Sequence, residues 1–198
     1  MDQKSAEWYE ARCGKLTGSR FSALMSTGKG REDLIRDLAW ERYTGKCIEG
    51  FSSAPMLRGI ELEPEARDWY VFVSGNSVLE EGFIEHSEIA NVGISPDGLV
   101  DDDGLIEIKC PMHRAHIETV ESRKLPSQYR WQVQGQLWVT GRKWLDFISY
   151  HPEHDGVIIR VDPSESDHAK LAESCIAANE EIESIVSLLK ARGGQQDG

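Results

Sequence analysis

Long apolar runs and a secretory leader are both missing from this sequence of 198 residues. No stretch approaches the roughly 18 uninterrupted apolar residues of a membrane-spanning helix, and the N-terminus, MDQK, lacks the apolar segment of a signal peptide. These absences predict a protein that stays in the cytoplasm. A content of 39% hydrophobic and 28% charged residues is ordinary for one globular domain. We expect that domain at residues 1–192, with 193–198 as a disordered tail.

Paired cysteine motifs and an excess of basic residues are missing as well. The sequence has four widely spaced cysteines and no CxxC pair, which favours reduced thiols over a disulfide framework, a zinc site or an iron–sulfur site. They are Cys13, Cys47, Cys110 and Cys175. A net charge of -12 opposes nonspecific binding of nucleic acid over the whole surface, because phosphates repel an acidic protein. It does not exclude a basic site confined to one groove.

Apolar residues at three- and four-residue spacing predict the helical part of the fold. Ser5 is the expected N-cap of a first short helix, and Thr17-Gly18-Ser19 precedes a second one. Glycine follows each of the next three helices, as is common at helix C-termini. The longer helices are expected at Arg31–Tyr43, Ile60–Val73, Pro126–Thr140 and Ser166–Ala191. The apolar stripe of the last one is expected to pack on the sheet or on a neighbouring subunit.

Alternation of apolar and polar residues predicts strands in the middle of the chain. Asp103-Gly104 is typical of a hairpin turn between two of them. The strands are expected at Val78–Ile89, Val92–Val100, Leu105–Cys110 and Trp144–Tyr150. Together with the helices they indicate an α/β fold.

The hairpin carries the residue types of a metal-dependent phosphodiesterase. Alternation places Glu107 and Lys109 on one face of a strand and Ile106 and Ile108 on the other, facing the core. The preceding SPDG segment could bring Asp97 beside them. Carboxylates are the hard oxygen ligands that Mg²⁺ prefers, and a cation near the nucleophile assists hydrolysis. An ExK pattern alone is common, however, and equally describes an exposed ion pair on a surface hairpin.

The remaining polar and aromatic residues give weaker signals. His113 and His116 could share a helix face, but no third metal ligand lies nearby in sequence. His151 and His154 are expected at the surface of a polar turn. The six tryptophans occupy periodic apolar positions and are mostly expected in the core, although Trp131 could line a DNA path.

Several ordered motifs at compatible spacing are far more specific than ExK. They are WYEAR at 8–12, Gly18-Ser19, Gly59 with Glu63 and Ala66-Arg67, SPDGL at 95–99, GLIEIKCP at 104–111, Tyr129 with QVQ at 132–134, and WVT at 138–140. From roughly Glu7 to Pro152 the chain resembles the lambda exonuclease or YqaJ-type phage recombination nucleases of the PD-(D/E)XK superfamily. The resemblance implies a restriction-endonuclease-like core, in which helices flank a central mixed sheet, with a long C-terminal helix.

The resemblance also assigns catalytic roles. It implies that Asp97, Glu107 and the Ile108 carbonyl bind Mg²⁺, with Mn²⁺ expected to substitute, and that Lys109 positions or activates the attacking water. Glu63 would complete the ligand set. By itself Glu63 is one of several acids early in a helix, so Glu61 and Glu65 remain competitors.

A pocket for a 5′-terminal phosphate is implied at four further residues, Arg12, Ser19, Ser95 and Gln132. Arg12 would offer a bidentate fork, and Ser19 stands at a predicted helix N-terminus, which attracts anions. Taken singly, Ser19 reads as a helix cap and Arg12 as a surface charge. Met56, Lys29 and Arg31 are further candidates for DNA contacts, and Met56 could equally belong to the core.

The resemblance therefore implies a 5′→3′ exonuclease that degrades one strand of linear double-stranded DNA and leaves 3′ single-stranded overhangs for phage-type recombination. By analogy it would form a ring-shaped homotrimer, act beside a single-strand annealing protein and, if phage-encoded, work in the host bacterial cytoplasm. The alternatives are an endonuclease or RecB-type nuclease domain of the same fold, or a non-catalytic DNA-binding module.

Overall fold

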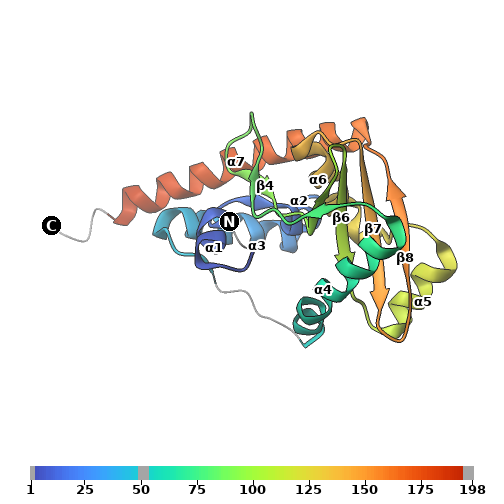
Figure 1. Cartoon of the computed structure of the whole chain (residues 1–198). Coiled ribbons are helices and arrows are strands. Elements are labelled where there is room, and N and C mark those ends of the chain that lie inside the picture. Colours follow the sequence, from blue (N-terminus) through green and yellow to red (C-terminus); the bar gives the residue numbers. More distant parts are fainter. Residues whose placement is uncertain (1–2, 49–53, 194–198) are drawn as a thin grey trace.

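The computed structural model describes residues 3–48 and 54–193, with side chains from Leu57 onward in the second range (Figure 1). Its centre is a five-stranded sheet in the order β2-β5-β6-β7-β8. The strands are β2 (Val78–Leu79), β5 (Gly98–Val100), β6 (Gly104–Lys109), β7 (Trp144–His151) and β8 (His154–Val161). The β6–β7 pair is parallel and the other pairs are antiparallel, so the sheet is mixed, as predicted.

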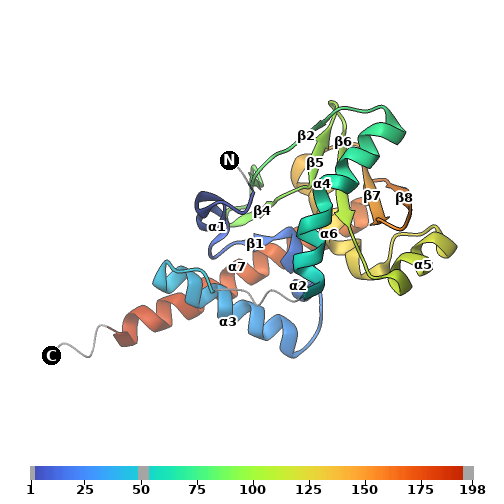
Figure 2. The same cartoon turned by 60° about the horizontal axis from the view of Figure 1, so that its bottom comes forward.

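A second, three-stranded sheet lies toward the N-terminal helices (Figure 2). It has the order β1-β4-β3, with β1 (Leu16–Thr17) parallel to β4 (Val92–Ile94) and β3 (Ile84–Glu85) antiparallel to it. The expectation of one strand at 78–89 and one at 92–100 was therefore wrong. Each breaks into two short strands in different sheets. Pro96 lies at the second break, where it has no N–H to donate to a ladder.

The predicted hairpin exists, but its turn lies earlier than Asp103-Gly104. Val100 pairs with Gly104, so the turn comprises Asp101 to Asp103, with Asp101 at φ 44°. Gly104 is needed inside β6, because a Cβ there would lie 2.2 Å from the Trp144 ring. The sequence shows the glycine but not the Trp144 ring, which occupies the space that a side chain at position 104 would need.

The helices mostly follow the predicted positions. They are α1 (Ala6–Arg12), α2 (Phe21–Leu24), α3 (Lys29–Thr44), α4 (Ala54–Ser74), α5 (His113–Ser122), α6 (Arg130–Thr140) and α7 (Glu165–Gly193), with 3-10 turns η1 (Gly18–Arg20) and η2 (Ser127–Tyr129). Ser5 caps α1 as predicted, its Oγ accepting the Trp8 N–H at 3.2 Å. The start of α4 precedes the expected Ile60, while β1, β8 and α5 were not predicted. Of the expected tail, Gly193 ends α7 and 194–198 lie outside the described residues.

Helices cover both faces of the five-stranded sheet. Ala66 and Tyr70 of α4 pack against Ile106 and Ile108, whereas α6 covers the opposite face, which carries Leu105. The alternation predicted for β6 is therefore confirmed. Glu107 and Lys109 face the α6 side.

The apolar stripe of α7 packs on other helices, not on the five-stranded sheet as one of the expectations had it. Its buried residues Leu171, Cys175 and Ile182 join Leu34 and Leu38 of α3 in a single apolar cluster. Figure 1 shows α7 extending from above the sheet along α3, so it links the two ends of the molecule. No helix within the described ranges is long and apolar enough to cross a membrane.

Candidate active site

The Glu107 carboxylate is buried between β6 and α6. It is 1% exposed and is contacted by the Lys109 ammonium, two residues along the same strand. Gln132 donates to Glu107 Oε1 at 2.6 Å, and Gln136 donates to Oε2 at 2.5 Å. One turn of α6 thus holds both oxygens of the carboxylate, because residues four apart share a helix face.

Asp97 reaches the same place from the irregular segment between β4 and β5. Its Oδ2 accepts the backbone N–H of Ile108 at 2.7 Å, which fixes it beside the strand that carries Glu107. Loss of hydration, followed by the charge of Glu107, raises the pKa of Asp97 well above its usual value, although Lys109 opposes this. The sequence prediction that Asp97, Glu107 and Lys109 converge is confirmed geometrically.

The Lys109 ammonium lies 5.3 Å from the centre of the Tyr129 ring. Desolvation alone would lower the pKa of Lys109, but the charges of Glu107 and Asp97 outweigh it and raise the pKa above its usual value. The group is therefore a cation at neutral pH. Lys109, Pro111 and Tyr129 line both a cavity of about 390 Å³ on the α4 side and one of about 370 Å³ on the α5 side.

Of the three acids early in α4, Glu63 is the one that lines the cavity containing Asp97. It is held there by Arg67 at 3.0 Å and Lys4 at 3.1 Å. Glu61 is exposed, and Glu65 accepts a hydrogen bond from Tyr150 at 2.6 Å. The position of Glu63 is therefore consistent with the predicted role, whereas Glu65 is committed elsewhere.

The donor set suits a hard divalent cation. The negative charges of Glu107 and Glu63 both raise the pKa of Asp97, so a cation among them would relieve their repulsion. In the described ranges no three His, Cys, Asp or Glu side chains are arranged to enclose a metal by themselves. Mg²⁺ does not require such a cage, because it keeps several waters and often takes only one or two carboxylates. As the resemblance implies, Asp97, Glu107 and the Ile108 carbonyl would be its protein ligands, and Glu63 would complete the set.

A second polar group gathers around Arg12, at the end of α1. The Arg12 guanidinium donates to Ser95 Oγ at 2.9 Å and to Ser19 Oγ at 3.4 Å, and it stacks 4.0 Å from the centre of the Trp8 ring. Trp8 Nε1 also donates to Ser95 Oγ, at 2.9 Å. Burial and the nearby Arg20 cation lower the pKa of Arg12 to about 10, so it stays charged at neutral pH. Three of the four predicted phosphate ligands are thus together.

The fourth, Gln132, lies between this group and the carboxylates. Its amide binds Glu107, while its Cγ lies 3.9 Å from the place where a Gly18 Cβ would be, next to Ser19. Ser95 and Asp97 also connect the two groups, since only Pro96 separates them in the chain. An anion-binding group and a carboxylate–lysine centre are therefore adjacent.

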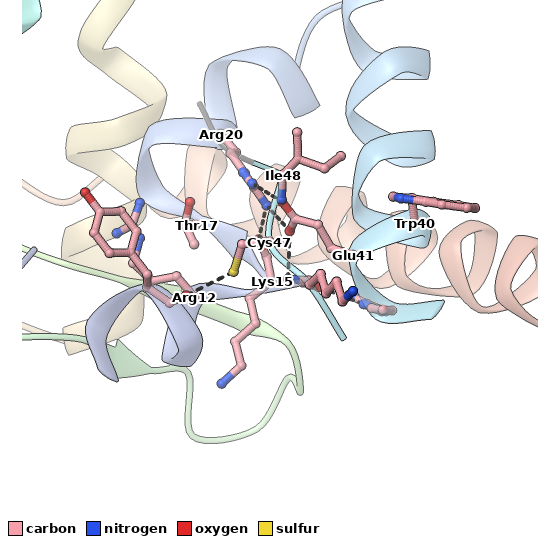
Figure 3. A network of polar contacts seen from close by, with 12 residues as sticks. Arg12, Lys15, Thr17, Arg20, Trp40, Glu41, Cys47 and Ile48 are labelled. Atoms are coloured by element: carbon pink, nitrogen blue, oxygen red, sulfur yellow. Dashed lines mark hydrogen bonds and ion pairs between the residues drawn. The ribbon is translucent and has the colours of Figure 1, made fainter. Parts of the chain in front are cut away.

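A buried acid, Glu41 of α3, binds the backbone that follows α1 and the side chain of Arg20 (Figure 3). Glu41 accepts the backbone N–H of Gly14 at 2.7 Å and of Ile48 at 3.2 Å, and it pairs with Arg20 at 2.9 Å. Burial would raise the pKa of Glu41, but Arg20 and the two backbone donors lower it on balance. Sequence reasoning missed Glu41, because it resembles the solvated acids elsewhere on the same helix.

Two of the three other predicted DNA contacts, Lys29 and Arg31, lie on α3 outside these groups. Lys29 is exposed at the start of α3. Arg31 pairs with Glu181 of α7, at 3.0 and 2.6 Å. Met56 falls in the first turn of α4, where the side chains are outside the described part of the structure.

The histidines and Trp131 depart in part from expectation. His113 is exposed, whereas His116 is buried and lies 2.9 Å from Ser149 Oγ. His154 is exposed as predicted, yet its Nδ1 is 3.3 Å from His116 Nε2. Trp131 packs against the apolar cluster of α3 and α7.

Gln136 is a site residue that the sequence did not reveal. It is 1% exposed, and its Oε1 has no hydrogen-bond partner in the described structure. For the Mg²⁺-dependent phosphodiester cleavage that the resemblance implies, we expect Gln136→Leu to lower the rate about tenfold and to raise the Mg²⁺ concentration needed for half the maximal rate, because partners of metal ligands commonly contribute 10–100-fold. A Mg²⁺ titration of the cleavage rate measures both effects.

Gln134→Leu is the matched control, since Gln134 is also buried in α6 but binds the Asp162 carbonyl and the Ser164 N–H instead. It should lower stability without changing the Mg²⁺ midpoint. Equal midpoints in the two variants would remove Gln136 from the site.

Comparison with known proteins places this geometry in a family. Residues 7–143 match the model of the YqaJ-like viral recombinase domain. The chain belongs to this family. The YqaJ-like domain thus covers both polar groups described above, from α1 to the end of α6.

Solved structures show the same fold. LHK-Exo, an alkaline exonuclease from Laribacter hongkongensis, is 38% identical to the YqaJ-like chain, with a TM-score of 0.91 over 96% of this chain and 99% of its own. Its complex with dAMP gives a TM-score of 0.92 at the same identity and coverage. A phage-related exonuclease from Haemophilus somnus 129PT shares the fold at 14% identity, with a TM-score of 0.72 over 88% and 96% of the two chains.

A curated relative is more distant. An uncharacterized protein of Acanthamoeba polyphaga mimivirus is 26% identical over 164 residues, which is 75% of this chain. The chain spans only 29% of the length of that relative. The predicted restriction-endonuclease-like fold and the predicted family are both confirmed by these comparisons.

Proposed function

We propose that the chain is a Mg²⁺-dependent exonuclease that degrades one strand of linear double-stranded DNA in the 5′→3′ direction and leaves 3′ single-stranded overhangs. The observation that carries this proposal is the adjacency of the Arg12 group to the carboxylate–lysine centre. A site that holds a terminal phosphate next to a site that hydrolyses a phosphodiester would restrict cleavage to the 5′ end. The similarity to LHK-Exo supports an exonuclease activity.

The residues of the two groups would have different roles in phosphate binding and hydrolysis. Arg12, Ser19 and Ser95 would hold the terminal phosphate, since the Arg12 guanidinium gathers both serine hydroxyls around it. Lys109 would place its positive charge beside the attacking water, and Gln132 and Gln136 would keep Glu107 in position. A bound divalent metal would polarise the phosphodiester and lower the pKa of water. Mn²⁺ should replace Mg²⁺, since both accept oxygen ligands.

The assembly and the partners form part of the same proposal. A homotrimeric ring with its cations directed inward would reconcile DNA binding with a net charge of -12. The overhangs would serve recombination by strand annealing, with a single-strand annealing protein as the partner that takes up the exposed strand. In a phage-encoded enzyme this work would take place in the host bacterial cytoplasm.

A comparison of DNA topologies tests the proposal. With Mg²⁺ we expect a linear 5′-phosphorylated duplex to be degraded from its 5′ ends and a covalently closed circle of the same sequence to remain intact. A duplex labelled at the 5′ end of one strand should release its label as a mononucleotide at the start of the reaction. EDTA should stop cleavage of the linear duplex.

Each alternative function gives a different result in the same assay. Efficient cutting of the closed circle would indicate an endonuclease and overturn the exonuclease proposal. DNA binding without cleavage in Mg²⁺ and in Mn²⁺ would indicate a non-catalytic binding module.

A further inference from the structure

Two of the four cysteines lie side by side in the fold, although they are far apart in the sequence. Cys13 is the C-cap of α1, and its N–H binds the Glu10 carbonyl at 3.1 Å. Cys47 follows the end of α3, and its Sγ donates to the Tyr9 carbonyl at 3.4 Å. Figure 3 shows the Cys47 sulfur directed at the backbone of α1. The Cys47 thiol therefore lies at the last turn of the helix that Cys13 caps.

Glu41 fixes this arrangement. Its Oε2 accepts the N–H of Gly14, the residue after Cys13, and its Oε1 accepts the N–H of Ile48, the residue after Cys47. One buried carboxylate thus holds both cysteine-bearing segments, and Arg20 holds the carboxylate in turn. The two cysteine-bearing segments are therefore joined through a shared hydrogen-bonded network.

The two thiols differ in accessibility. Cys47 is exposed, whereas Cys13 is partly buried. Burial, together with the contact to Cys47, raises the pKa of Cys13 to about 12. Cys47 is therefore the thiol that a reagent in solution meets first, and Cys13 is the neighbour placed to react with it.

We propose that Cys13 and Cys47 form a site of reversible oxidation, at which a low-molecular-weight disulfide such as glutathione disulfide converts them to an intramolecular disulfide. In the first step the Cys47 thiolate attacks one glutathione sulfur, the S–S bond of glutathione disulfide breaks, and one glutathione thiolate leaves. In the second step Cys13 loses its proton and attacks Cys47 Sγ, which expels the second glutathione thiolate. Two electrons pass to glutathione, and both leaving thiolates take up protons.

The location of this site would link it to the Arg12 group. Cys13 directly follows Arg12, and a bond between the thiols would take Cys47 Sγ away from the Tyr9 carbonyl. The disulfide would tie the end of α1 to the segment after α3. The other two cysteines offer no such pairing with these segments, since Cys175 is buried against α3 and Cys110 follows Lys109 at the end of β6.

Exposure of the full chain to glutathione disulfide, followed by alkylation and peptide mass analysis, tests the proposal. We expect a Cys13–Cys47 linked peptide in protein that has lost two free thiols, reversal by dithiothreitol, and unmodified Cys110 and Cys175. Because the pKa of Cys13 is about 12, its thiolate fraction rises about 100-fold between about pH 7 and about pH 9, so closure should be faster at the higher pH.

Variants separate the two steps. Cys13→Ser should stop at the Cys47–glutathione mixed disulfide, and Cys47→Ser should leave Cys13 largely unmodified. Cys110→Ser is the matched control and should form the Cys13–Cys47 link as the parent does. Four free thiols after prolonged exposure at about pH 9, linkage of either residue to Cys110, or only intermolecular disulfides on a non-reducing gel would each overturn the proposal.

Discussion

Replacing Lys109 with alanine should reduce DNA cleavage by about 100- to 1000-fold, the scale reached when one preorganised donor to the transition state is removed. Lys109 is a cation that contacts Glu107 and lies over the Tyr129 ring, and the charges of Glu107 and Asp97 keep it protonated. Duplex binding should stay within about threefold of the parent protein, because a single phosphate contact contributes little to total DNA affinity. Single-turnover cleavage and filter binding measure the two effects separately.

Two further variants test whether cleavage depends on the position of the Lys109 charge. Lys143→Ala removes a lysine that is 73% exposed and pairs with Asp103, and it should cleave at the parental rate. Lys109→Arg keeps a cation but moves it, so it should recover only part of the activity. The Lys109→Ala protein should remain folded, because Glu107 keeps both glutamine donors. Near-normal turnover in a folded Lys109→Ala protein would refute the assignment of the active site.

The elements that sequence predicted well are those whose signal is local. Alternation in β6 reported correctly that Ile106 and Ile108 face the core while Glu107 and Lys109 face the other way. Ser5 and the glycine after α3 marked real helix ends, since each acts within one turn of its own position. The long helix α7 followed from its apolar stripe.

The elements that failed depend on partners far along the chain. The strands at 78–89 and 92–100 break because their halves pair with different sheets, which no local period encodes. The position of Gly104 is set by the Trp144 ring, and the surroundings of His116 by the hairpin that carries His154. The local pattern of apolar and polar residues predicts whether a segment forms a strand, whereas tertiary contacts decide where that strand ends.

The candidate site shows the same division. Glu107 and Lys109 lie on one strand of a hairpin and Asp97 directly precedes the other strand, so their closeness could be predicted from the local sequence. Arg12 meets Ser95 across 83 residues of sequence, and only resemblance to a family pointed to that contact. No feature of the sequence indicated Gln136 or Glu41. In a sequence, a buried glutamine or glutamate of a helix cannot be told from a solvated one until its partners are known.

Arg12→Ala should remove the preference for 5′-phosphate over 5′-hydroxyl ends. In the structure the guanidinium has two serine hydroxyls as partners and carries a full charge at neutral pH, since its pKa is about 10. A hydrogen bond to a charged group contributes about 1.5–3 kcal/mol, so we expect the ratio of kcat/KM for the two ends to fall by about 10- to 100-fold. Matched duplexes that differ only at the 5′ end give this ratio directly.

Comparing arginine with lysine at position 12 distinguishes a specific phosphate pocket from a general attraction between a positive charge and DNA. Arg12→Lys retains the charge but loses the two-pronged donor, so it should restore only a small part of the phosphate preference. Arg36→Ala removes an exposed arginine that pairs with Glu32 within α3, and it should leave the ratio unchanged. Because Arg12 also packs on Trp8, the variants must be compared at equal folded fractions. An unchanged ratio in folded Arg12→Ala would exclude Arg12 from the phosphate pocket, while the carboxylate–lysine centre would stand on its own evidence.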